Sequence, residues 1–293
     1  MKAANTILVP IDFNEQSLIA LGQACHIARK MRLDITLLYV MEESGIFAQI
    51  FTEDQSEKMK EKVLERLDKL ADETFKKERI TVKTMFAHGR IYSKIIETSE
   101  LINAKFIILG TRSEVEEGKK ASGANSSRVI RYAKCPVISI NGKNHYNGCR
   151  SILLPLDLTK QTRQKVTKAI EIAKYFGSTI KVMSALMTGQ DYVIKKLKGQ
   201  IYQVKDIIEE KNIKCTAEIV TTTKKEKTLA QAILNYAKKQ KDIDLIILMT
   251  QQEVNWVEFF VGSTTSEVIR TTDIPVMTIT PSHFDGTREI LAY

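Results

Sequence analysis

The stretch ILVPIDF, residues 7–13, returns nearly unchanged as ILLPLDL, residues 152–158. Each copy is an apolar run that contains a proline and reaches an aspartate at its end. Two further stretches recur in the same order: FIILGT (106–111) as LIILMT (245–250), and VIRYAKCPVISI (129–140) as VIRTTDIPVMTI (268–279). Matches at both ends of a segment, in fixed order, indicate the duplication of one domain.

The junction between the copies, NGKNHYNGCR (141–150), is rich in Asn and Gly and poor in apolar residues. Such a composition is typical of a linker. We therefore predict two domains, residues 1–143 and residues 144–293.

Within each copy, short apolar runs alternate with longer stretches whose apolar residues have helical spacing. The predicted strands of the first copy are TILVPI (6–11), ITLLYV (35–40), TVKTMFA (81–87), FIILG (106–110) and PVISI (136–140). Those of the second are SILLPL (151–156), TIKVMSA (179–185), IKCTAEIV (213–220), LIILM (245–249) and PVMTI (275–279). Nearly continuous apolar strands require a parallel sheet that is covered on both faces. The predicted fold is α/β: two tandem copies of a doubly wound, five-stranded parallel sheet with helices on both faces.

A long amphipathic helix is predicted over residues 56–77 of the first copy. Its apolar side is predicted from the helical spacing of five residues. They are Met59, Val63, Leu67, Leu70 and Phe75.

The composition excludes several classes of protein. The formal charge is +9, but the basic residues are spread over short groups that are typical of solvated helix faces, so no nucleic-acid partner is predicted. No run of eighteen apolar residues occurs, so no membrane association is expected and the location is predicted to be cytoplasmic. The four cysteines show neither CxxC spacing nor a cluster with histidines, which predicts reduced thiols and no metal site.

Signals for catalysis are missing. The patterns GxxxxGK[ST] and GxGxxG do not occur, and Cys25 and His26 diverge as neighbours on a helix. Asp12 could be taken for a catalytic acid, but the sequence places no second titratable group with it to act as its partner. No enzyme activity is predicted.

Three features together resemble one family. PIDFNE (10–15) follows the first strand, a glycine-spaced loop (110–123) follows the fourth, and CPV (135–137) opens the fifth. In this order they resemble the universal stress protein family, and their repetition resembles a tandem member. The resemblance implies the sheet order 3-2-1-4-5 in each copy. Ligands of such sheets bind outside the carboxyl ends of the strands at the switch point, here between strands 1 and 4.

Nucleotide-binding members of that family carry Gly, two residues, Gly, nine residues, Gly and then Ser or Thr. Glycines admit a ligand close to the backbone, and the helix that follows offers free N–H groups to an anion. The first copy keeps the spacing but has Ser113 at the second glycine and Ala124 at the hydroxyl position. The resemblance implies a site for ATP or a related adenine nucleotide, with Mg. Its residues would be Asp12, Val40, Gly110, Ser113, Gly123, Asn125 and Ser126.

The second copy departs further from this pattern. Met249 and Gln252 replace the first two glycines, and the loop 250–261 holds no Lys or Arg but several large apolar residues, among them Trp256. We predict that this loop is buried, either over its own crevice or against another chain. The degenerate second site would consist of Asp157, Gly262, Ser263 and Thr265.

Two functions remain open from the sequence. One is a stress-response regulator whose N-terminal domain binds an adenine nucleotide; the other is a nucleotide-independent interaction or dimerisation module of the same fold. In either case the fifth strands, 136–140 and 275–279, are apolar edge strands, and an unpaired apolar edge invites association. We predict self-association through these strands, as an antiparallel pair within one chain or in a homodimer. The sequence names no protein partner.

Overall fold

The computed structural model describes residues 5–42, 53–111, 123–142, 148–156, 162–186, 191–221, 228–250 and 263–281. The first half supplies β1 (Thr6–Pro10), α1 (Glu15–Met31), β2 (Asp34–Met41), α2 (Glu53–Glu78), β3 (Val82–His88), α3 (Ile91–Leu101), β4 (Phe106–Gly110), α4 (Gly123–Tyr132) and β5 (Val137–Ile140). The second half supplies β6 (Ser151–Pro155), α5 (Thr162–Phe176), β7 (Thr179–Leu186), α6 (Asp191–Glu209), β8 (Cys215–Thr221), α7 (Leu229–Gln240), β9 (Leu245–Met249), α8 (Ser263–Thr271) and β10 (Val276–Ile279). The predicted α/β class and the tandem repeat are confirmed.

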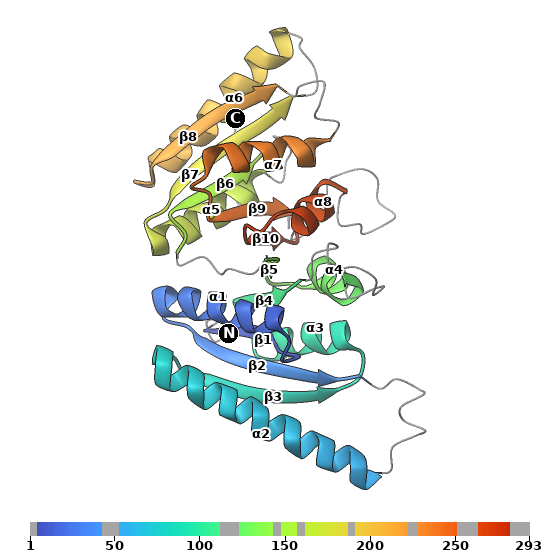
Figure 1. Ribbon diagram of the computed structural model, residues 1–293. Coiled ribbons are helices and arrows are strands. Elements are labelled where there is room, and N and C mark those ends of the chain that lie inside the picture. The colour runs from blue at the N-terminus through green and yellow to red at the C-terminus, as the bar shows by residue number, and fades with distance from the viewer. Residues whose placement is uncertain are drawn as a thin grey trace, which may run out of the picture.

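The ten strands of the described residues join one sheet, in the order β3-β2-β1-β4-β5-β10-β9-β6-β7-β8. Within each half the strands are parallel, and the central pair, β5 with β10, is antiparallel. Figure 1 shows the two halves one above the other, with β5 and β10 meeting between them and α2 and α6 at the far ends. The predicted fifth strands therefore cover each other's edges inside one chain.

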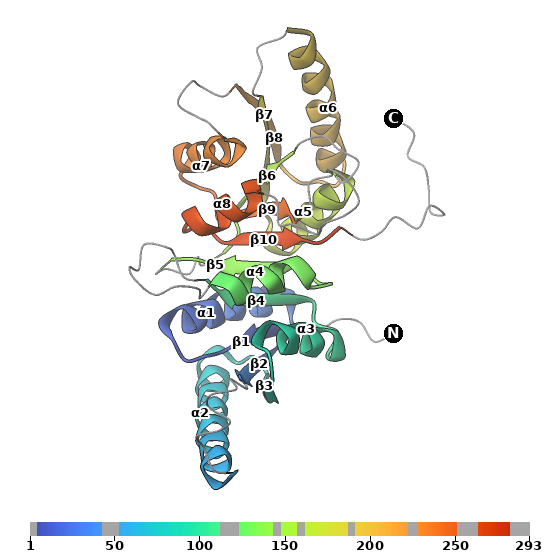
Figure 2. The ribbon, with the colours of Figure 1, turned by 90° about the vertical axis from the view of Figure 1, so that its right-hand side faces the viewer.

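Alternation along the strands creates two hydrophobic cores, one on each face of the sheet. Ile7 and Val9 of β1 face a core shared with α1, α2, α5 and α6, whereas Leu8 faces a core shared with α3, α4, α7 and α8. In Figure 2 the upper half shows both layers, with α7 and α8 on one side of the sheet and α5 and α6 on the other. Strands buried on both faces explain why their sequences are continuously apolar.

The apolar side predicted for α2 is partly wrong. Leu67 and Ala71 are buried, but Met59 is 50% exposed and Phe75 is 48% exposed. Thr74, three residues after Ala71, is buried, whereas Phe75, four residues after Ala71, is exposed, so at the end of α2 the buried face follows the three-residue step.

The residues that follow the fifth strands cap helices of the opposite half. The Asn141 side-chain amide lies 3.2 Å from Ile269 O, 3.1 Å from Arg270 O and 3.3 Å from Thr272 O, at the C-terminal end of α8. Thr280 Oγ1, at the matching place after β10, donates to Ala133 O at the end of α4 at 2.9 Å. Terminal carbonyls of a helix lack partners within that helix, so each half supplies partners to the other.

An ion pair also joins the halves. Lys105 Nζ, just before β4, lies 2.9 Å from Glu171 Oε1 on α5, and Lys168 Nζ lies 2.5 Å from Glu171 Oε2. Burial raises the pKa of the Glu171 carboxyl, but hydrogen bonds from Lys168 and Lys105 outweigh this, so its pKa lies below the usual value. Folding therefore favours the ionised form of Glu171.

Candidate functional site

The aspartate of the first repeat forms a tight turn between β1 and α1. Asn14 caps the helix, because its side-chain oxygen accepts from Ser17 N at 2.9 Å. Asp12 in turn accepts from Asn14 N at 3.1 Å and from Asn14 Nδ2 at 2.5 Å. The carboxylate of Asp12 is exposed, and each carboxylate oxygen can accept a further hydrogen bond.

Three of the residues predicted to bind a nucleotide lie at the carboxyl ends of neighbouring strands. Asp12 follows β1, Val40 lies near the end of β2, and Gly110 ends β4; β1 pairs with both other strands. Val40 is half-buried and packs on the core shared with α3 and α4. The structure thus brings together residues that are far apart in the sequence at the switch point of the first half.

Helix α4 supplies the remaining described members of the predicted site. It begins at Gly123, and Asn125 and Ser126 lie half-buried in its first turn. In Figure 1, α4 lies at the end of the sheet towards which the β2 and β3 arrows point. The free N–H groups of such a helix start suit an anion. Ser113 lies outside the described residues.

At the carboxyl ends of the matching strands in the second half, the described side chains are buried. Met249, which matches Gly110, is 6% exposed, and its carbonyl accepts from Thr265 Oγ1 at 2.8 Å. Lys165, which matches Ala20 of α1, is 6% exposed, and its Nζ lies 3.4 Å from Pro155 O at the end of β6. Thr265 is predicted as part of a degenerate site, and its hydroxyl donates its hydrogen bond to a backbone carbonyl instead.

The other predictions for this region are only partly covered by the described chain. Ser263 is the first residue of α8, and Thr250 is buried. Asp157, Gly262 and the segment 251–261 with Trp256 lie outside the described residues.

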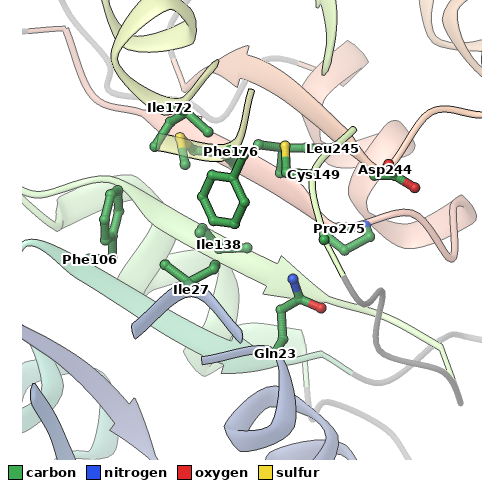
Figure 3. A pocket seen from close by; sticks show the side chains of 12 residues that line it. Gln23, Ile27, Phe106, Ile138, Cys149, Ile172, Phe176, Asp244, Leu245 and Pro275 are labelled. Carbon is green, nitrogen blue, oxygen red and sulfur yellow. The ribbon is translucent and has the colours of Figure 1, made fainter. Parts of the chain in front are cut away.

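A small cavity between the halves lies elsewhere. It has a volume of about 20 Å³, room for roughly one water molecule. Figure 3 shows Gln23 and Ile27 of α1 on one side of it and Phe176 of α5 on another, with Asp244 just before β9. Asp244 and Cys149 precede β9 and β6, so the cavity lies towards the amino ends of these strands, away from the Asp12 turn.

Other reactive groups are few in the described part of the chain. No group of three or more His, Cys, Asp or Glu there could hold a metal ion, and none of its helices is long and apolar enough to span a bilayer. Burial raises the pKa of Cys25 to about 11 and that of Cys149 to about 12, so both thiols stay protonated at neutral pH. A protonated thiol is a poor nucleophile.

The structure is thus an α/β fold of two tandem halves, with the Asp12 turn and the start of α4 at the switch point of the first half. The model of the universal stress protein family matches residues 4–141 and again residues 148–280. The chain therefore belongs to the universal stress protein family and contains two tandem copies of its domain.

Individual relatives agree with this assignment. Universal stress protein MJ0531 of Methanocaldococcus jannaschii is 29% identical over 140 residues, which is 46% of this chain and 80% of that protein. Universal stress protein YxiE of Bacillus subtilis is 25% identical over 149 residues, 46% of this chain and 98% of that protein.

Among solved structures, a universal stress protein from Archaeoglobus fulgidus matches with a TM-score of 0.74 at 20% identity, over 95% of this chain and 97% of that one. A functionally unknown protein, PA1789 from Pseudomonas aeruginosa, matches with a TM-score of 0.66 at 18% identity, over 95% and 93%. At these identities the two structures support the tandem fold alone.

Sequence reasoning missed three residues near the two switch points. Asn14 could have been found, because an Asn directly before a helical pattern is a typical N-cap. Lys165 gave no signal, since a lysine within an amphipathic helix is normally exposed. Gln16 also gave none, because the close approach of its backbone to Gly110 at the end of β4 depends on how α1 docks on the sheet.

Proposed function

We propose that this universal stress protein binds one adenine nucleotide per chain, in the N-terminal crevice, and that the C-terminal crevice is closed by its own side chains. The observation that carries the proposal is the contrast between the two switch points. The first has the exposed Asp12 carboxylate and a glycine at the end of β4; the second has Met249 and Lys165, both buried. The proposed domains are residues 1–143 and 144–293, in a cytoplasmic protein.

Each residue of the proposed site has a chemical role. Asp12 would accept hydrogen bonds from ribose hydroxyls, and Val40 would offer an apolar surface to the base. Gly123, Asn125 and Ser126, with Ser113 in the loop before them, would hold phosphates at the start of α4. Magnesium would enter with the phosphates, bound by their oxygens and by water. The proposed role is regulatory binding without catalysis.

Calorimetric titration with ATP and Mg²⁺ tests the proposal. We expect one site per chain with a Kd in the micromolar range or weaker. Gly123→Val should abolish binding, because a branched side chain would stand at the helix start. Gly262→Val, the matching change in the second half, should leave the affinity unchanged. Two equal sites, or loss of binding in Gly262→Val alone, would contradict the proposal.

A second candidate function is a nucleotide-independent interaction module. The observation in its favour is that packing alone explains the glycine at position 110, because a side chain there would collide with α1. If titration with ATP gives no heat, and if denaturing the purified protein releases no nucleotide, this function replaces the first.

A further inference from the structure

Helix α1 crosses the end of β4 at very close range. A Cβ built on Gly110 would lie 2.4 Å from Gln16 O, 2.5 Å from Gln16 C and 2.9 Å from Gln16 Cβ. Two of these atoms are helix backbone, which cannot rotate away as a flexible side chain can. Even alanine at position 110 therefore requires the first turn of α1 to move.

The residues at the start of α1 also fix the position of Asp12 through hydrogen bonds. Ser17 N donates to Asn14 Oδ1 at 2.9 Å, and Ser17 Oγ donates to Asn14 O at 3.0 Å. Asp12 N lies 3.4 Å from Ser17 Oγ, and the Asp12 carboxylate accepts from both the backbone and the side-chain nitrogens of Asn14. A displacement of the turn is thus passed to Asp12 through several short contacts.

The residue between them limits how the turn can adjust. Phe13 has a φ of 62°, a conformation that bulky residues rarely adopt. Its ring lies 5.7 Å from the Tyr39 ring, and the Arg66 guanidinium of α2 lies 4.1 Å from its centroid. Because β2 and α2 hold Phe13 in place, the turn cannot relax by swinging outward as a unit.

We propose that Gly110 is a positioning residue: it admits the first turn of α1 over β4 and thereby places the Asp12 carboxylate at the crevice. The inference deepens the proposed function and rests on it for its consequence in binding, though not for its structural part. It gives the first glycine of the motif a role towards the chain itself rather than towards a ligand. In the second half, Met249 has a buried side chain at the matching place.

Hydrogen exchange of the protein without nucleotide tests the structural part. In Gly110→Ala, the amides of Ser17 and Leu18 should exchange about tenfold faster than in the wild type, because the displaced turn loses its cap. Gly199→Ala is the matched control: Gly199 lies in α6 with no atom within 4 Å of an added Cβ, and its variant should leave α1 unchanged. A folded Gly110→Ala with wild-type exchange at Ser17 and Leu18 overturns the proposal.

Should Gly110→Ala fail to fold while Gly199→Ala folds, the collision is supported, because Gln16 O and C are backbone atoms that stay in place. Failure of both variants to fold overturns it, since Gly199→Ala meets no neighbouring atom and the loss of fold would then have another cause.

ATP titration tests the consequence for binding. Asn14→Ala leaves β4 untouched but removes the Nδ2 hydrogen bond to Asp12 and the side-chain cap of Ser17 N, so it should weaken ATP binding about tenfold, as Gly110→Ala does. Wild-type affinity in Asn14→Ala, together with loss in Asp12→Ala, overturns the positioning role. If the wild type binds no ATP, the proposed function fails, while the exchange experiment still decides on the contact.

Discussion

The two switch points of this chain occupy matching places in the two repeats, and they differ in the residues at the carboxyl ends of the strands. In the first half, helix backbone approaches a glycine and an aspartate stays exposed. In the second half, Met249 and Lys165 are buried, and Thr265 donates its hydroxyl to a carbonyl. A duplicated domain can thus keep its sheet and helices while the residues at the carboxyl ends of its strands diverge.

Removing Met249 from the second crevice should have the largest effect on stability. Met249→Ala is expected to lower the free energy of unfolding by about 2–4 kcal/mol, the usual cost of truncating a buried methionine. Chemical denaturation at neutral pH measures this cost. Met59→Ala is the matched control, since Met59 is 50% exposed and its truncation should cost about 0.5 kcal/mol or less.

The same variant sharpens the comparison of the two crevices. Met249→Ala should not create a second ATP site, because Lys165 and Thr265 remain in place. A second calorimetric site in this variant would show that Met249 alone separates the two copies.

The predictions for the strands, for α2 and for the switch points show which parts of the structure follow from the sequence. The strands could be predicted, because a sheet covered on both faces requires short apolar runs, and these alternate with stretches of helical spacing along the chain. The exposed Phe75 could not, since helical spacing leaves the direction of the buried face uncertain by one residue at the end of a long helix. The contact of Gln16 with Gly110 depends on docking between segments far apart in the sequence, which periodicity does not encode.

The reciprocal caps between the halves should differ in strength. Asn141 faces three carbonyl oxygens of the C-terminal end of α8, whereas Thr280 faces one at the end of α4. Asn141→Ala should cost about 2 kcal/mol and Thr280→Val about 1 kcal/mol, because each leaves buried acceptors without donors. Thermal and chemical unfolding of the two variants measure this. Equal costs would mean that water replaces the Asn141 amide.

The smallest expected effect concerns the ion pair of Lys105 with Glu171, and it depends on pH. Since the pKa of Glu171 is lowered in the folded protein, its ionised form stabilises the fold. The contribution is complete above the pKa of an unfolded glutamate, ~4.3, and is lost as the pH falls through the lower folded-state pKa. Glu171→Gln should therefore cost about 1 kcal/mol or less at pH 7. Near pH 3 the difference from the wild type should shrink. Glu61→Gln, at an exposed position of α2, controls for general acid effects. A Glu171→Gln cost that persists unchanged in acid would show that packing, rather than charge, joins the halves there.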